Sequence, residues 1–324
     1  MGVRDLVRML DNQEYQACMK AAESMLLLGQ LSPQEQTMAY HALCRSRIGF
    51  QDYFGAAEAG NAAVEGARQT GDYDMLGRAL LDLGVAQVHI RQYEPAIQTF
   101  STYLLCRAHF DAALQHEGKV FFNLAVTFRR IGRYDDALQY ALAARRWFDQ
   151  AGDALAADES RRSAVATLLL AGRLDEADRL LREGDAYQQS IDEPQALLEH
   201  TLQRSELHLL RGEHTCSIEL AFSALEGAGD DLALQSRSHL LLCQNALAMQ
   251  RWKDALGFAL AARVAAIDGR FYDLEFEASE LMFGLLQNQG FDLLRELDQE
   301  YFAIGLDICH YISESVYRRQ TRSN

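Results

Sequence analysis

The 324-residue sequence has few prolines, and none of them lies where it would break a helix. There are three: Pro33 follows Ser32 in a Ser-Pro-Gln-Glu capping box, Pro95 opens a helix-compatible segment, and Pro194 follows an acidic turn. Proline is tolerated in the first turn of a helix and is strongly disfavoured further inside. The three prolines therefore mark helix starts, and the rest of the chain is free to be helical.

The sequence also lacks the signals of several functional classes. No apolar run approaches the roughly 18 residues of a membrane span, and no secretory signal opens the chain. There is no Gly-rich phosphate loop, nucleophile elbow, paired-carboxylate signature or C-x-x-C pair, and the six cysteines are interpreted mainly as small buried residues. We therefore predict a cytoplasmic, non-enzymatic protein with no catalytic residues, no metal, no cofactor and no membrane partner.

Basic residues are outnumbered by acidic ones, 31 against 46, which gives a formal net charge of -15. Nucleic-acid binding depends on neutralising phosphates, so this balance argues against a nucleic-acid partner. The exception is local: residues 101–150 hold seven basic and five acidic groups, whereas residues 151–200 hold five basic and eleven acidic groups. A partner with an acidic segment would be steered toward the first of these stretches.

What the sequence does contain is a helical hairpin, seen most clearly in residues 121–148. Phe121, Leu124 and Phe128 form the apolar stripe of one helix, Gly132 ends it, and Tyr134 begins a second amphipathic helix. A large aromatic residue then precedes a small alanine by three residues. One hairpin cannot bury both of its faces, so copies are expected along the chain.

Copies occur at a nearly fixed period. The small residue of the second helix is spaced 38, 40, 41, 40, 40 and 38 residues apart along the chain. These ladder residues are Cys18, Ala56, Ala96, Ala137, Ala177, Ser217 and Ala255. Twelve residues before each of them lie Leu6, Cys44, Gly84, Ala125, Val165, Ser205 and Cys243. Mostly small residues in both rows predict that the two helices of each hairpin cross closely at this point.

The pattern of Leu124, Ala125, Gly132, Tyr134 and Ala137 resembles the tetratricopeptide repeat family, with a period of about 40 residues in place of the usual 34. The longer period is similar to that of bacterial peptide-sensing regulators and signalling scaffolds. The resemblance implies an all-α fold, an α-solenoid (right-handed superhelix) of about eight antiparallel hairpins forming a single domain over residues 1–324. The expected repeats are about 2–30, 35–68, 76–110, 117–150, 157–186, 197–228 and 235–267, followed by a degenerate capping hairpin and C-terminal helix at 274–320.

In such a superhelix the first helix of each hairpin lines the concave side, so polar residues on that face are candidate ligand contacts. The resemblance points to eight residues of this concave groove: Arg45, Arg78, Asp82, Lys119, Asn123, Arg162, Gln203 and Gln244. Asn can donate and accept hydrogen bonds to an extended backbone, while Lys and Arg can bind a carboxylate. In the family such residues hold peptides, and Lys119 with Asn123 partly resembles that arrangement.

A second group of polar residues lies in one hairpin: His200, Glu206, His208, Glu213 and His214. No two of these histidines are separated by four residues, and His214 fills the aromatic slot of the ladder, so a structural role is favoured over a metal site.

The sequence predicts a final helix from about Asp292 to Arg319, which together with the C-terminal aromatic residues would cap the solenoid. The apolar stripe of this helix suggests the hypothesis of a homodimer through this end. Three functions fit the pattern: a scaffold or adaptor that binds a protein or peptide, a peptide-responsive regulator resembling quorum-sensing receptors, and an aspartyl-phosphate phosphatase of the same group. The last two usually carry an N-terminal effector region, and the repeats here begin near Met1, which favours the first.

Overall fold

The computed structural model describes residues 2–110, 116–188 and 193–289, with residues 186–188 described by their backbone alone. Within these ranges every regular element is helical and there is no strand, so the all-α solenoid prediction is confirmed. The chain divides into two compact units, Met1–Thr167 and Leu168–Asn324. The single domain expected from the repeats stays a prediction.

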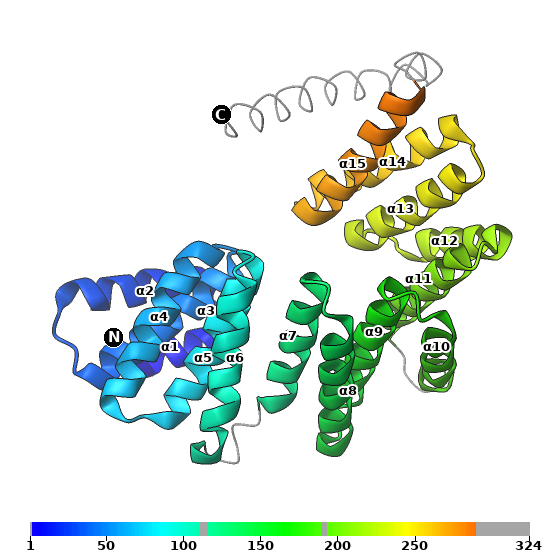
Figure 1. Cartoon of the computed structure of the whole chain (residues 1–324). Coiled ribbons are helices and arrows are strands. Elements are labelled where there is room, and N and C mark those ends of the chain that lie inside the picture. The colour runs from blue at the N-terminus through cyan, green and yellow to red at the C-terminus, as the bar shows by residue number, and fades with distance from the viewer. Residues whose placement is uncertain (1, 111–115, 189–192, 290–324) are drawn as a thin grey trace, which may run out of the picture. The chain divides into compact units, whose positions relative to one another are not determined.

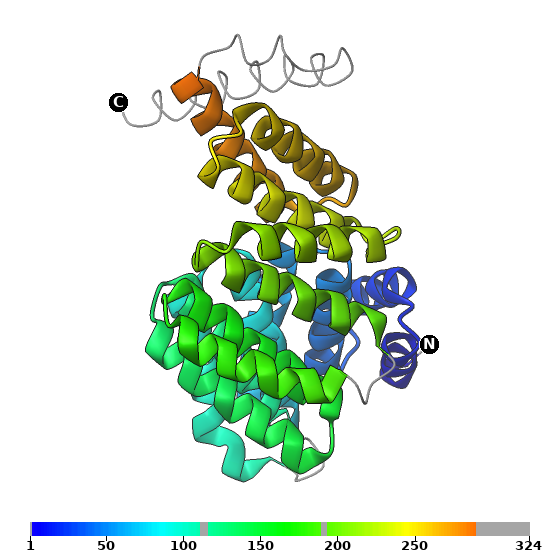
Figure 2. The ribbon, with the colours of Figure 1, turned by 90° about the vertical axis from the view of Figure 1, so that its right-hand side faces the viewer.

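Unit 1 contains four helical hairpins and the start of a fifth (Figures 1 and 2). Its elements are α1 (Val3–Asp11), α2 (Tyr15–Leu28), α3 (Pro33–Gly49), α4 (Tyr53–Thr70), α5 (Tyr73–His89), α6 (Tyr93–Cys106), the short 3-10 helix η1 (Arg107–His109), α7 (Glu117–Arg130), α8 (Tyr134–Ala151) and the first part of α9 (Ala154–Leu170). Each of α2 to α7 packs against the helix before it and the helix after it in the chain. A hydrophobic core runs from Val3 to Ala137 through these hairpins.

Unit 2 continues with the end of α9 and six further helices (Figures 1 and 2). They are α10 (Leu174–Gln188), α11 (Pro194–Leu210), α12 (His214–Gly227), α13 (Leu232–Ala248), α14 (Trp252–Asp268) and α15 (Tyr272–Gln289). Successive helices from α10 to α15 pack against each other. α15 covers the first part of the expected capping hairpin at 274–320, and the rest of that stretch, with the expected C-terminal helix, lies outside the described residues. The dimer through this end stays a prediction.

The ladder residues are the points at which the helices of each hairpin cross. All seven, from Cys18 to Ala255, have no exposed surface, and the residues twelve positions earlier are also buried. The contact is direct in two hairpins: the Cys18 thiol lies 3.6 Å from the Leu6 carbonyl, and the hydroxyls of Ser205 and Ser217 each donate to the other residue's carbonyl at 2.8 Å. Small side chains are required because the backbones approach this closely.

The turn within each hairpin places one residue in the left-handed conformation, five positions before the ladder residue. Three hairpins use glycine there, and Gly132 has φ +77° as expected for a residue that ends a helix. Four other hairpins use larger residues: Gln13, Gln51, Arg91 and Gln250 have φ between 58° and 60°. The turn geometry is therefore kept even where its most favourable residue is missing.

The helix starts follow the sequence signals. Ser32 accepts a hydrogen bond from the Glu35 backbone N–H, and Glu35 accepts one from the Ser32 N–H, which forms the predicted capping box. Aspartate side chains cap α4, α5 and α13 by accepting from backbone N–H groups of their first turns. In the described part of the chain, no helix is both long and apolar enough to cross a membrane.

Candidate functional site

A pocket of about 520 Å³ opens on the face of unit 1 formed mainly by the first helices of its hairpins. We call it the unit 1 pocket. It is lined by His41, Arg45, Arg78, Leu81, Asp82, Val85, His116, Lys119, Phe122, Asn123, Phe148, Asp153, Ala156 and Glu159. These residues come from α3, α5 and α7, from the end of α8, and from the start of α9. The volume falls within the roughly 300–1,000 Å³ typical of small-ligand sites.

Five of the eight residues predicted for the groove line this pocket together: Arg45, Arg78, Asp82, Lys119 and Asn123. Arg78 and Lys119 occupy matching positions on α5 and α7, as do Asp82 and Asn123, and Arg45 lies in an adjacent inward-facing row on α3. The sequence thus located a face whose polar residues converge on one cavity.

The other three predicted residues lie elsewhere. Arg162 on α9 donates to the buried carboxylate of Asp158 at 3.1 Å. Gln203 is buried on α11 and Gln244 is half-buried on α13, both in unit 2.

Asp82 is the centre of a small polar network on one wall of the pocket. His41 Nε2 donates to Asp82 Oδ2 at 2.9 Å, and Arg45 Nε lies 3.7 Å from the same oxygen. The His41 side chain is only 9% exposed, so its imidazole is fixed by this bond. Asp82 therefore orients its neighbours, and its charge is already balanced.

Two cations on the same wall have no such partner. Arg78 on α5 and Lys119 on α7 are exposed, and neither forms an ion pair with any residue in the described ranges. Beside them, burial and the positive charge of Lys119 lower the pKa of His116, so this imidazole is neutral at pH 7. The wall is left with positive charge that an incoming anion can bind.

The part of the lining contributed by the start of α9 and the turn before it, which we call the α9 wall, is acidic. Asp153 precedes the helix and accepts a hydrogen bond from the Ala156 backbone N–H at 3.1 Å, which is the geometry of a cap. Glu159 follows on the same helix and also lines the pocket. Apolar side chains, among them Phe122 and Phe148, also line the pocket. The pocket therefore offers positive charge, apolar surface and negative charge to a ligand.

Asn123 stands on α7 one turn after Lys119, as its spacing predicted. Its side-chain N–H donates to the Lys119 carbonyl at 2.8 Å. This bond fixes the amide and leaves its oxygen as an acceptor for a ligand. A backbone N–H of a ligand is a suitable donor for it.

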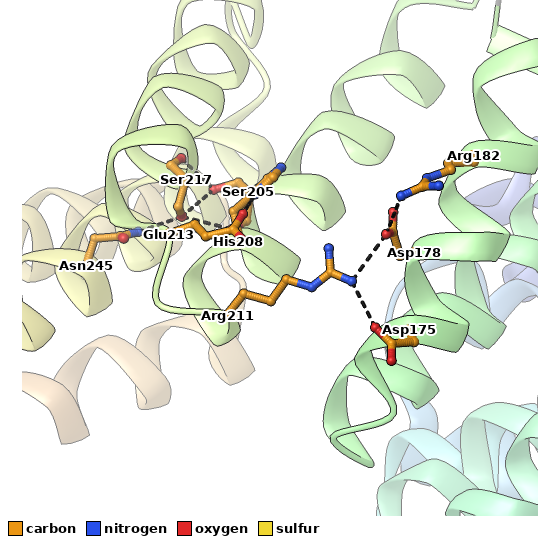
Figure 3. A network of polar contacts seen from close by, with 9 residues as sticks. All are labelled: Asp175, Asp178, Arg182, Ser205, His208, Arg211, Glu213, Ser217 and Asn245. Atoms are coloured by element: carbon orange, nitrogen blue, oxygen red, sulfur yellow. Dashed lines mark hydrogen bonds and ion pairs between the residues drawn. The ribbon is translucent and has the colours of Figure 1, made fainter.

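The polar residues of unit 2 form structural contacts (Figure 3). His208 Nδ1 donates to Glu213 at 2.5 Å. His214 Nδ1 lies 3.1 Å from Asn245 Oδ1. The side-chain nitrogen of Asn245 donates to the Ser217 hydroxyl at 2.8 Å. Each of these two histidines therefore has its own hydrogen-bond partner. No group of three His, Cys, Asp or Glu side chains in the described part of the chain is arranged to hold a metal ion.

A second cavity, of about 470 Å³, lies between α10, α11 and α12 in unit 2. Its main polar feature is Asp185, which accepts from His200 Nε2 at 2.8 Å and from Arg204 at 2.9 Å. Burial alone would raise the pKa of Asp185, but these two partners outweigh it and hold the pKa below its usual value. The carboxylate is thus engaged within the hairpins, and the unit 1 pocket is the better candidate for a ligand.

Several lining residues were not among the eight predicted contacts. The repeat spacing does place Glu159 in the row of Arg78 and Lys119, but it was not selected as a ligand contact. Phe148 comes from the end of α8 and Asp153 from the α8–α9 turn, and no signal in the sequence placed either of them at this pocket.

The fold is that of a tetratricopeptide-like helical repeat protein. The crystal structure of RapI in its apo form matches with a TM-score of 0.63 at 12% sequence identity, covering 96% of this chain and 97% of that one. The crystal structure of NprR in complex with its cognate peptide NprX matches with a TM-score of 0.60 at 11% identity, covering 95% of this chain and 98% of that one. No protein-family model matches the sequence. No curated protein matches it either.

Proposed function

We propose that this chain is a non-enzymatic scaffold or adaptor that binds a short peptide, or an exposed segment of a protein, in the unit 1 pocket. The observation that carries the proposal is the convergence of polar side chains from three successive first helices on one cavity that apolar side chains also line. Such a cavity fits an extended segment better than a folded surface, because stable contacts between folded proteins bury a far larger area.

A peptide-responsive regulator is the second candidate. It is favoured by the fold likeness to NprR, a protein whose structure holds its cognate peptide, and by the extent of the likeness over both chains. The two candidates share the binding step and differ in its consequence, since a regulator must change the state of an effector when the peptide binds. No feature in the described part of the chain favours the phosphatase hypothesis.

The test uses a display library of random peptides selected on the whole protein. Peptides enriched by the wild type are then measured by isothermal titration calorimetry with a Lys119→Glu/Asn123→Ala double variant. Both residues lie on the pocket wall and neither is buried, so the variant should keep its fold, which circular dichroism checks. We expect the double variant to lose most of the binding.

The matched control is Arg146→Glu, a charge reversal at an exposed position on the second helix of the same hairpin. It should bind the selected peptides as the wild type does. Selection of no peptide would contradict the proposed function, and equal binding by the double variant would move the site away from the unit 1 pocket.

A further inference from the structure

In the unit 1 pocket, the cations Arg78 and Lys119 and the acidic residues of the α9 wall come from different parts of the chain, and this arrangement limits which ligands fit. Arg78 and Lys119 occupy equivalent positions on the first helices of neighbouring hairpins, eighteen residues before Ala96 and Ala137. Two exposed positive charges at equivalent positions of neighbouring hairpins repel each other, and an anion placed between them removes that repulsion. The positive wall is therefore suited to a carboxylate.

The other groups on this wall do not cancel its charge. The Asp82 carboxylate is bound by His41 and Arg45. His116 adds no charge at pH 7, because burial and Lys119 lower its pKa. The cations that remain available to a ligand are Arg78 and Lys119.

The α9 wall has the opposite sign. Asp153 uses one carboxylate oxygen to accept the Ala156 N–H, which leaves the second oxygen as an acceptor for a ligand. Glu159 is a second carboxylate of this lining and has an interaction partner within the chain, so Asp153 is the carboxylate on which the inference rests.

Apolar side chains complete the lining, among them Phe122, Phe148, Leu81 and Val85. A ligand that reaches from Arg78 and Lys119 to the α9 wall gains by placing an apolar group against these side chains, because water there gains few hydrogen bonds. An acidic and a basic group at the two ends of the same ligand then meet complementary charge.

We infer that the unit 1 pocket selects a short dipolar peptide, with an acidic group toward Arg78 and Lys119, an apolar residue over Phe122 and Phe148, and a basic group toward Asp153. This inference rests on the proposed function and adds the chemical class of its ligand. It also fixes the direction in which the ligand's charges lie.

The test uses a synthetic pool of pentapeptides randomised at every position, acetylated and amidated so that only side chains carry charge. Peptides retained by the whole protein are identified by mass spectrometry at low and at high salt. We expect enrichment of peptides that carry both an acidic and a basic residue around an apolar one, and weaker enrichment at high salt, because exposed charges are screened.

Two variants test the positive and the negative residues of the pocket separately. Arg78→Gln/Lys119→Gln should abolish the enrichment of acidic residues and leave that of basic residues. Asp153→Asn should do the reverse, since asparagine still caps a helix. For one resynthesised dipolar peptide, each variant should lose about threefold to tenfold in affinity.

Two controls carry the same changes outside the pocket. Arg146→Gln removes an exposed charge from α8, and Asp72→Asn alters the aspartate that caps α5 by accepting from the Met75 N–H. Both should retain the wild-type enrichment. Enrichment without charge preference, or a preference unchanged in the pocket variants, would overturn the dipolar ligand while leaving peptide binding intact. Enrichment of no peptide would contradict the proposed function itself.

Discussion

Glycine 84 provides a sensitive test of the helix crossing in the third hairpin. A Cβ atom added there would lie 2.3, 2.6 and 2.8 Å from three ring carbons of Phe100, which has no exposed surface. Ordinary contacts begin near 3.4 Å, so the buried ring would have to shift by about 1 Å. Alanine gains about 1 kcal/mol in helix propensity over glycine, while overpacking costs about 1–3 kcal/mol. We therefore expect Gly84→Ala to be destabilising by up to about 2 kcal/mol.

The matched control is Gly257→Ala on α14, where an added Cβ meets no atom within 4 Å. There the same substitution should stabilise by about 0.5–1 kcal/mol, because only the propensity term remains. Thermal unfolding followed by circular dichroism measures both, at about 2–4 °C per kcal/mol for units of this size. Phe100→Leu in the Gly84→Ala background should recover part of the loss. If both glycine variants were stabilised equally, α5 and α6 would not cross at this residue.

Three further predictions test the repeat register, the turns and one ion-pair network. Ala137→Leu should lower the free energy of unfolding in urea by about 1–3 kcal/mol, because the helix crossing leaves no room for leucine. Ala17→Leu, at an exposed helix position, should change it by no more than about 0.5 kcal/mol. Equal effects of the two substitutions would contradict the repeat register. Gln51→Gly should stabilise by up to about 1 kcal/mol, since glycine adopts its φ of 60° without a Cβ penalty, and a lower melting temperature would contradict this reasoning. Burial raises the pKa of Asp178, but hydrogen bonds and ion pairs with Arg211 and a second arginine hold it below its usual value (Figure 3). Arg211→Met should therefore cost up to about 1 kcal/mol at neutral pH, and the difference from wild type should disappear as acid protonates Asp178; a pH-independent difference would count against the ion pair.

Much of the fold could be predicted from the sequence because one physical constraint repeats along it. Two helices can cross closely only where both side chains are small, so the crossing leaves residues such as Ala137 at regular intervals. All seven ladder residues are fully buried in the structure. The left-handed turn residues were harder to predict. Only three hairpins place glycine there, and residues such as Gln51 carry no turn signal of their own.

The serine pair of the sixth hairpin shows another limit of sequence reasoning. Ser205 and Ser217 were predicted as small packing residues, and both are buried. Their reciprocal hydrogen bonds, and the bond from Asn245 to the Ser217 hydroxyl, depend on rotamers and on the neighbouring hairpin (Figure 3). Polarity at a crossing point was visible in the sequence, but the partner of each hydroxyl was not.

Five of the fourteen lining residues followed from the repeat register, because a helix period fixes which residues of a repeat share a face. The repeat spacing brought Arg78 and Lys119 together without any knowledge of the turns. It could not distinguish Arg162, which bonds to an acid on its own helix, Asp158. It also could not place Asp153, since the approach of a turn depends on how successive hairpins pack.

The net charge of the chain and the charge of the pocket favour different ligands, and a dipolar peptide satisfies both. A chain of net charge -15 repels a strongly acidic ligand beyond contact distance, although Arg78 and Lys119 would bind it once it arrived. A strongly basic ligand would be attracted over the surface but would meet these two cations inside. A peptide with one charge of each sign has no net charge to be steered or repelled, and screening limits such forces to about 8 Å at physiological salt. Selection then depends on contacts within the pocket, where the positions of Arg78, Lys119 and Asp153 decide which end of the peptide lies against which wall.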